Sequence, residues 1–187
     1  AHVMGSLPRL GAHGGRAAAE GAVDEKMGPV DAVVVQQYVL SSRPLVVRGG
    51  AAEWATSGRW HDDAALAAHC GGCHLNVELA TQEDPRRENY SAKSRDMPIA
   101  DFVAGYRSNP WYAFSPVPGP LLDDLPLPPE LASRGTLAAL QSVDLWWSRG
   151  GTVGCLHFDL SDNLHCQVAG RKDWVLFPPA EASHLHF

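Results

Sequence analysis

The C-terminal third of the sequence consists of short apolar segments of strand length, separated by glycine or asparagine turns. With 187 residues, the chain has room for one domain with a hydrophobic core. Closely spaced strands of this kind predict an antiparallel barrel or a double-sheet jelly roll. The predicted strands are residues 141–147, 155–160, 164–168 and 173–177.

Upstream of these strands, helical and strand patterns alternate, so the predicted class is mainly β with α. Apolar residues recur at helical spacing in 31–40 and 99–106, and His61-Asp62-Asp63 predicts the capped start of a helix over 64–69. The patterns also predict strands over 45–47, 75–79 and 111–114, a polar loop over 81–96 and an irregular proline-rich connection over 116–129. Residues 1–28 are rich in glycine and alanine and predict a flexible leader, which leaves 29–187 as the domain.

A histidine and an aspartate lie two residues apart within the segment 155–160. Because strand side chains alternate between faces, His157 and Asp159 would project from the same face. An imidazole nitrogen and a carboxylate oxygen make up two-thirds of the 2-His-1-carboxylate triad, which binds Fe(II) and leaves positions open for oxygen and a co-substrate. Lys172, on the last apolar segment, would pair with a carboxylate of that co-substrate. The alternatives are a surface His–Asp hydrogen bond on an edge strand and a solvated lysine at a strand end.

The net charge and the hydrophobic pattern of the sequence disfavour nucleic acids and membranes as binding partners. The net charge of −6 disfavours sequence-independent nucleic-acid binding, and the basic residues Arg86, Arg87, Lys93 and Arg95 are interpreted as a solvated loop. No apolar run approaches the roughly 20 residues that span a bilayer, and the N-terminus has no secretory signal pattern. Four cysteines in such a chain need not be paired. We therefore expect a cytoplasmic or nuclear protein that does not bind membranes.

Cys70-Gly-Gly-Cys73-His74 matches the pattern for covalent c-type haem attachment. The motif would bridge a helix end and a buried strand, where an accessible loop is needed, so haem is disfavoured. A zinc site is also disfavoured, because no second Cys/His pair lies at the usual spacing. Cys155 and Cys166 flank the His-x-Asp segment, and Cys155 would share the face of His157 as a packing residue.

The order of motifs from Arg43 to Phe187 resembles that of the JmjC/cupin-like Fe(II)/2-oxoglutarate-dependent hydroxylases, which include the factor-inhibiting-HIF-type enzymes. The resemblance is strongest over 151–179. It implies a double-stranded β-helix, a cupin-like jelly roll, with helices from the N-terminal half packed against it. The motifs that carry it are Arg43-Pro-Leu-Val-Val-Arg-Gly-Gly50, Trp54, Trp60, Met97-Pro-Ile-Ala-Asp-Phe-Val103, Trp111-Tyr112, Trp146-Trp147 and His157-x-Asp159.

Position by position, the resemblance implies that His157 and Asp159 are ligands of Fe(II). Lys172 and the Tyr112 hydroxyl would bind the distal carboxylate of 2-oxoglutarate, and Asn163 would lie near its metal-bound end. A lysine inside a barrel is costly unless it is paired, and a dicarboxylate supplies the missing anion.

Two positions depart from the family pattern. Relatives often carry Ser or Thr three residues before the metal histidine, where this chain has Gly154, and Thr152 on the same strand face would partly compensate. Relatives supply the second metal histidine from a later strand. The sequence stops at Phe187, so we expect a domain truncated before that ligand, with the C-terminal part of the barrel missing. His184 and His186 are interpreted as exposed histidines of a surface loop.

These features predict an Fe(II)- and 2-oxoglutarate-dependent dioxygenase that hydroxylates a protein side chain. Histone demethylation is disfavoured, because demethylases of the superfamily more often have glutamate where this chain has Asp159. A tRNA base is a less favoured substrate, and the resemblance allows a homodimer in the full-length protein. The contrasting hypothesis is a catalytically inactive cupin-like binding module that lacks the third metal ligand.

Overall fold

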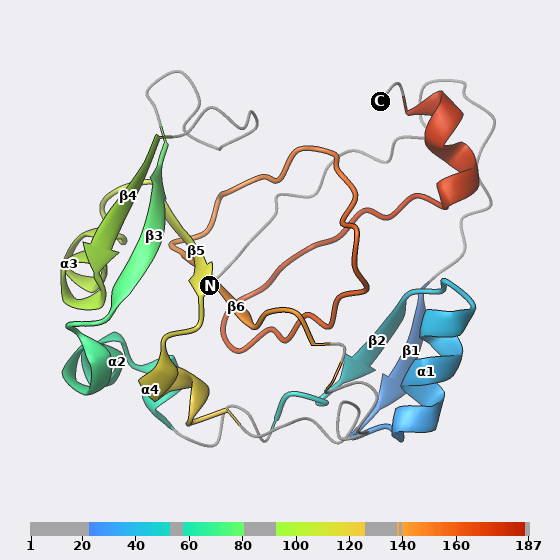
Figure 1. Ribbon diagram of the computed structural model, residues 1–187, viewed down its shortest axis with the longest axis horizontal. Helices are drawn as coiled ribbons and strands as arrows, with labels where there is room; N and C mark the ends of the chain where they lie inside the picture. The colour runs from blue at the N-terminus through green and yellow to red at the C-terminus, as the bar shows by residue number, and fades with distance from the viewer. Residues whose placement is uncertain (1–22, 53–57, 81–92, 126–137, 139, 186–187) are drawn as a thin grey trace.

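The computed structural model describes residues 23–52, 58–80, 93–125, 138 and 140–185. Its strands form a parallel pair, β1–β2, and an antiparallel four-stranded sheet in the order β4-β3-β5-β6. Figure 1 shows the two sheets at opposite sides of the molecule, with the C-terminal segment looping between them. This mixed α/β arrangement positions the candidate site described below.

The parallel pair is built from β1 (Asp24–Met27), α1 (Ala32–Leu40) and β2 (Leu45–Arg48). The predicted helix and the strand after it are confirmed, and Asp31 Oδ1 caps α1 by accepting the Val33 N–H at 2.7 Å. The sequence assigned β1 to a flexible leader. Its four residues are instead paired with β2, and residues 1–22 of that leader lie outside the described part of the chain.

The four-stranded sheet contains β3 (His74–Leu79), β4 (Lys93–Pro98), β5 (Trp111–Pro116) and β6 (Asp144–Ser148). Three of these strands were predicted, but β4 was taken for a polar loop. Lys93 to Asp96 are exposed on β4, which is an edge strand paired only with β3 in the described sheet. Charged edge residues carry little of the apolar alternation that marks a strand in sequence.

Helix α3 (Ile99–Gly105) packs against β3 and β4, helix α2 (Asp63–Cys70) packs against α3, and the main core lies between these helices and the sheet. The Phe102 ring stacks on Tyr106 at a centroid separation of 5.0 Å and meets the edge of Trp147 at 5.1 Å. The helix α4 (Gly119–Leu122), which lies inside the predicted irregular connection, buries Leu121. The buried residues of this core are Trp60, Leu66, Cys70, Leu75, Val77, Met97, Ile99, Phe102, Tyr106, Ala113, Leu121 and Trp147.

The cap of α2 gives a direct test of this local structure. Asp62 Oδ1 accepts the Ala64 N–H at 2.8 Å, which satisfies a backbone donor that the helix leaves unpaired. Replacing Asp62 by alanine should lower the free energy of unfolding by about 1 kcal/mol, measured by urea denaturation. The control is alanine at the exposed Asp162, which caps none of the described helices and should change stability by less than about 0.5 kcal/mol. Equal effects of the two substitutions would contradict the capping role.

The predicted strands over 155–160, 164–168 and 173–177 are wrong for this structure. After β6 the chain runs through loops to the 3₁₀ helix η3 (Pro179–His184), and none of these three segments forms a strand. A strand requires a backbone partner along its length, and these segments lie along no such ladder in the described residues. The described residues therefore form an antiparallel four-stranded sheet of the mixed α/β class, but they do not form the complete barrel that the sequence predicted.

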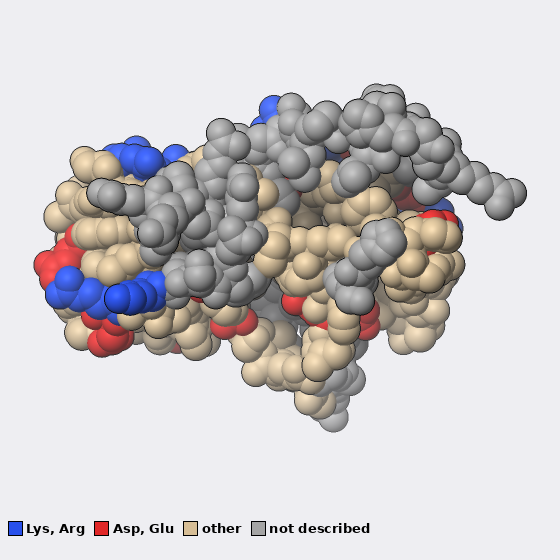
Figure 2. Space-filling model, turned by 90° about the horizontal axis from the view of Figure 1, so that it is seen from above, with Lys and Arg blue, Asp and Glu red and all other residues tan. Residues whose placement is uncertain are grey.

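The surface mixes both signs of charge. At the end of the molecule formed by α2, α3 and β4, basic and acidic side chains are interspersed (Figure 2). Of the basic residues singled out in the sequence, Lys93 and Arg95 are exposed on β4, and Arg86 and Arg87 lie outside the described residues. None of the helices in the described part of the chain combines the length and the apolar character needed to cross a membrane.

Candidate functional site

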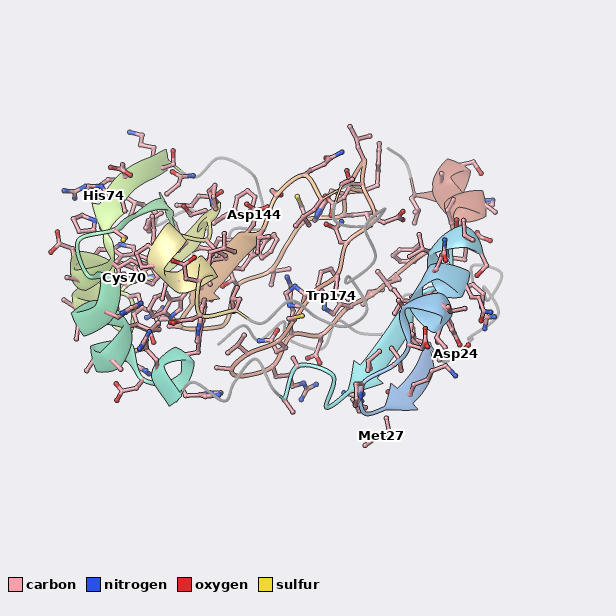
Figure 3. All side chains as sticks on the ribbon, turned by 60° about the horizontal axis from the view of Figure 1, so that its bottom comes forward. Asp24, Met27, Cys70, His74, Asp144 and Trp174 are labelled. Carbon is pink, nitrogen blue, oxygen red and sulfur yellow. The ribbon has the colours of Figure 1, made fainter. Side chains whose placement is uncertain are left out.

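The sheet face opposite α2 and α3 carries residues of β5 and β6. Tyr112 lies in register with Ser148, and Phe114 with Trp146, so all four share one face. Trp147 and Ala113, at the alternate positions, belong to the helix-covered core. The candidate site lies on the side of Tyr112 and Trp146, where His165 and Lys172 of the loops after β6 lie against the Trp146 ring. Figure 3 labels Trp174 in these loops.

His157 and Asp159 approach each other in these loops. The His157 Nε2 atom lies 3.8 Å from Asp159 Oδ1, and the side chains are 48% and 62% exposed. His157 Nδ1 lies 2.7 Å from the Cys155 carbonyl oxygen. A carbonyl can only accept, so Nδ1 carries the proton and Nε2 presents its lone pair on the side of Asp159. Bonds from nitrogen or oxygen ligands to a metal such as zinc are about 2.0–2.2 Å long, so one ion can contact both atoms.

Asn163 holds the carboxylate of this pair. Its Nδ2 donates to Asp159 Oδ2 at 3.1 Å and to the Ser161 carbonyl at 3.0 Å. The hydrogen bond to Oδ2 leaves Oδ1 directed toward His157. Side chains that orient a metal-binding carboxylate in this way tune the ligand. The structure thus brings Asn163 next to Asp159, while its predicted contact with a co-substrate stays a prediction.

The ammonium group of Lys172 is held by aromatic rings. Its Nζ lies 4.3 Å from the centre of the Trp174 ring and 5.6 Å from that of Trp146. Burial lowers the pKa of Lys172, and the negative charge of Asp159 partly offsets this by raising it. Lys172 is therefore a half-buried cation within electrostatic reach of the predicted metal ligand. An anion placed against it would relieve the cost of burial.

Thr152 is buried just after β6, and Tyr112 is buried on β5 beside the last residue of β6. Gly150 and Gly151 adopt φ values of 92° and 74°, and these left-handed conformations turn the chain back toward the sheet. The Thr152 hydroxyl then donates to Ser148 Oγ at 3.2 Å, and Ser148 is the register partner of Tyr112. Both residues are therefore on the side of the sheet where Trp146 meets Lys172, and their predicted roles in binding stay predictions.

Sequence reasoning missed the aromatic surroundings of Lys172. Trp174 is two residues from Lys172, a spacing that could have indicated a shared face. Trp146 entered only as a family anchor, and His165 was given no role. The His165 ring lies 5.3 Å from the Trp174 ring and 6.0 Å from the Trp146 ring, centre to centre, and Phe114 stacks on Trp146 at 5.3 Å.

The other histidines and cysteines weighed as metal ligands in the sequence lie elsewhere. In the described residues no group of three or more His, Cys, Asp or Glu side chains is arranged to hold a metal ion. His184 Nδ1 is 3.0 Å from Glu181 on η3, and His186 lies outside the described residues. His74, next to Cys73, pairs with Asp96 of β4.

The thiol of Cys70 is buried at the end of α2, where it donates to the Leu66 carbonyl at 3.5 Å. Burial raises the pKa of Cys70 to about 11, so at pH 8 only about one such thiol in a thousand is ionised. We expect Cys70 to react with iodoacetamide at least about tenfold more slowly than the half-buried Cys155, as measured by peptide mass spectrometry. Equal rates would show that Cys70 is accessible.

Comparison with known proteins identifies a family that the sequence of this chain matches. The model of a family described as a cupin-like domain matches residues 31–187. The lysine-specific demethylase JMJ30 of Arabidopsis thaliana is 26% identical over 157 residues, which cover 77% of this chain and 34% of the relative. The bifunctional peptidase and (3S)-lysyl hydroxylase JMJD7 of Homo sapiens is 22% identical over 167 residues, or 81% of this chain and 52% of the relative.

A third relative matches over a shorter stretch. The tRNA wybutosine-synthesizing protein 4 of Neurospora crassa is 36% identical over 83 residues, which cover 37% of this chain and 6% of the relative. The chain therefore spans about half or less of the length of these relatives. No solved structure matches the chain significantly.

Proposed function

This chain belongs to the cupin-like domain family, and we propose that it is part of an Fe(II)- and 2-oxoglutarate-dependent dioxygenase that hydroxylates a protein side chain. The observation that carries the proposal is the juxtaposition of His157 and Asp159, 3.8 Å apart, with the half-buried Lys172 in electrostatic reach of Asp159. Relatives named as a lysine-specific demethylase and a lysyl hydroxylase support an oxidative reaction on a protein.

The residues present fit a ferrous ion. A neutral imidazole nitrogen and a carboxylate oxygen are two of the three donors in the open triad that binds Fe(II). The backbone carbonyl of Cys155 fixes the tautomer of His157, and Asn163 orients Asp159, as second-sphere hydrogen bonds do in metal sites. The third donor, which the resemblance assigns to a later strand in relatives, is absent from the described residues. We also propose that the four-stranded sheet is part of a complete jelly-roll barrel.

The surroundings of Lys172 fit 2-oxoglutarate. Its ammonium is the cation that the distal carboxylate would meet, and the partly exposed indole rings of Trp146 and Trp174 would cover one side of that ion pair. Tyr112 and Thr152, on the same side of the sheet, are the hydroxyl donors proposed to complete the carboxylate site. A Cβ atom at Gly154 would meet no other atom within 4 Å. Crowding therefore does not explain why this chain has glycine where relatives often have the hydroxyl of Ser or Thr.

The division of labour follows from these contacts. When bound, Fe(II) and 2-oxoglutarate supply the oxidising power that inserts an oxygen atom of O₂ into a substrate C–H bond, with succinate and carbon dioxide as by-products. His157 and Asp159 would hold the metal, Lys172 would fix the far end of the co-substrate, and the aromatic rings would position the Lys172 ammonium. Asp159 in place of glutamate favours hydroxylation over demethylation.

The proposal is tested by succinate production from 2-oxoglutarate with added Fe(II), measured on this chain and on the full-length product of its gene. We expect turnover that requires both Fe(II) and 2-oxoglutarate. Succinate formation should rise further with a protein substrate, and protein should be preferred over tRNA. Absence of iron-dependent succinate from the full-length product would reject the dioxygenase.

The second candidate is a cupin-like binding module without catalysis. The observation that favours it is that the described residues offer two metal donors near each other and no group of three. Such a module would bind a carboxylate at Lys172 without forming succinate. Saturable binding of 2-oxoglutarate with no turnover in the full-length product would select this candidate. Homodimerisation is proposed for the full-length protein in either case.

A further inference from the structure

His165 lies against the same two indole rings as Lys172, those of Trp146 and Trp174. Both groups contact the Trp174 ring, Lys172 Nζ at 4.3 Å and the imidazole of His165 at 5.3 Å. Both also lie against Trp146, at 5.6 Å and 6.0 Å. Two basic side chains that share two indole rings are close enough for the charge of one to act on the other.

Two hydrogen bonds define the proton on neutral His165. The Gln167 side-chain amide donates through Nε2 to the Ala169 carbonyl at 2.6 Å, which turns its Oε1 toward His165. His165 Nε2 lies 3.1 Å from that oxygen, which can only accept. The proton of the neutral ring is therefore on Nε2, and Nδ1 is the nitrogen that gains a proton when the ring becomes charged. That nitrogen has no hydrogen-bond partner among the described residues.

His165 is an exposed residue, and the partial burial of its ring and the positive charge of Lys172 both disfavour its protonated form. Burial lowers its pKa most, the hydrogen bond with Gln167 opposes this, and the positive charge of Lys172 lowers it further. Lys172 is the charged group among the described residues that acts on this imidazole. An anion held by Lys172 would cancel that repulsion and would favour the imidazolium.

We propose that His165 is the second basic group of the co-substrate site and takes up a proton at Nδ1 when a dicarboxylate binds at Lys172. This inference rests on the proposed 2-oxoglutarate site and adds a coupling to pH. Protonated His165 places a second positive charge near the bound carboxylate. Affinity for 2-oxoglutarate should therefore be higher at about pH 6 than at pH 8, by about threefold to tenfold.

The test is isothermal titration calorimetry of the chain with 2-oxoglutarate near pH 7. Saturating Mn(II) is added beforehand to occupy the metal ligands without turnover. Repeating the titration in buffers of different ionisation enthalpy gives the number of protons taken up. We expect uptake of a fraction of one proton, and near-zero uptake with His165→Phe, which keeps a ring against Trp146 and Trp174. The control is His74→Gln, on β3, far from Trp174 in Figure 3, and it should behave as the unmodified chain.

The outcomes separate the two proposals. Equal proton uptake by the unmodified chain and His165→Phe would overturn the role of His165 and leave the 2-oxoglutarate site standing. Absence of saturable binding at every pH would overturn the co-substrate site and this inference with it. A second measurement avoids any folding defect of the variant. NMR titration of the unmodified chain should show the pKa of His165 rising by about half a unit to one unit when 2-oxoglutarate is added, and an unchanged pKa would also reject the proposal.

Discussion

Replacing His157 by alanine is expected to abolish iron-dependent succinate production in the full-length gene product, with a loss of at least about a hundredfold. The side chain supplies the one imidazole of the His157–Asp159 pair, and its lone pair is directed by the hydrogen bond to the Cys155 carbonyl. Without it, only the carboxylate remains of the two donors. Asp159→Ala should have an equally large effect, since it removes the other donor. The measurement is the initial rate of succinate formation at saturating 2-oxoglutarate.

The matched control for this prediction is His184→Ala. His184 is another exposed histidine beside an acidic side chain, with Nδ1 3.0 Å from Glu181 on η3. Its loss should leave turnover unchanged, which separates metal ligation from a general effect of removing an exposed His–carboxylate pair. Full iron-dependent turnover in both His157→Ala and Asp159→Ala would show that the ligand assignment is wrong.

The second large effect is expected from Lys172→Ala, which should raise the KM for 2-oxoglutarate by about tenfold to a hundredfold. An ion pair to a half-buried ammonium is worth more than one at the surface, because less water competes for the charges. Since the proposed contact is to the far end of the co-substrate, kcat at saturation should change less than KM. Steady-state succinate formation over a range of 2-oxoglutarate concentrations measures both.

Lys26→Ala is the control for Lys172, because Lys26 lies exposed on β1. It should leave the KM unchanged. An unchanged KM in Lys172→Ala as well would remove that residue from the site. Lys172→Met would keep much of the packing against Trp146 and Trp174, and it should behave like the alanine variant if charge is what binds the carboxylate.

Lys172 also implies a dependence on alkaline pH. Burial lowers its pKa below that of an ordinary lysine, and only the protonated form attracts an anion. The quantity kcat/KM for 2-oxoglutarate should therefore fall as pH rises through the lowered pKa. Lys172→Arg should move that fall to higher pH, because guanidinium stays charged. A pH profile with the same alkaline fall in both proteins would assign it to another group.

Local rules of sequence predicted the elements whose stability is local. Asp31 and Asp62 cap helices because a carboxylate accepts backbone N–H groups two or three residues later, a relation contained in a few consecutive residues. The alternation of Leu75, Val77 and Leu79 predicted β3 because one face of that strand is buried. By contrast, β1 and β4 gave no such signal, since they depend on pairing with distant strands and present polar residues to solvent.

The loops after β6 show the reverse error. Residues 155–177 have the composition of strands, yet they form none here, because a strand exists only where another segment supplies the matching ladder. His157 and Asp159 nevertheless approach each other, since they are only two residues apart in the chain, and His157 Nε2 lies 3.8 Å from Asp159 Oδ1. The prediction that His157 and Asp159 lie close together therefore agrees with the structure, although the predicted strand over 155–160 does not form.

By itself, the sequence determined the chemistry available to the site: an imidazole and a carboxylate two residues apart, and a lysine soon after them. Tertiary structure alone decided what surrounds that lysine. Trp146 from β6 and Trp174 from the last loop lie against the Lys172 ammonium, and the His165 ring lies against the same two indole rings. Contacts between residues so far apart in the chain depend on the path of the whole backbone, and desolvation of a charge depends on every group packed around it.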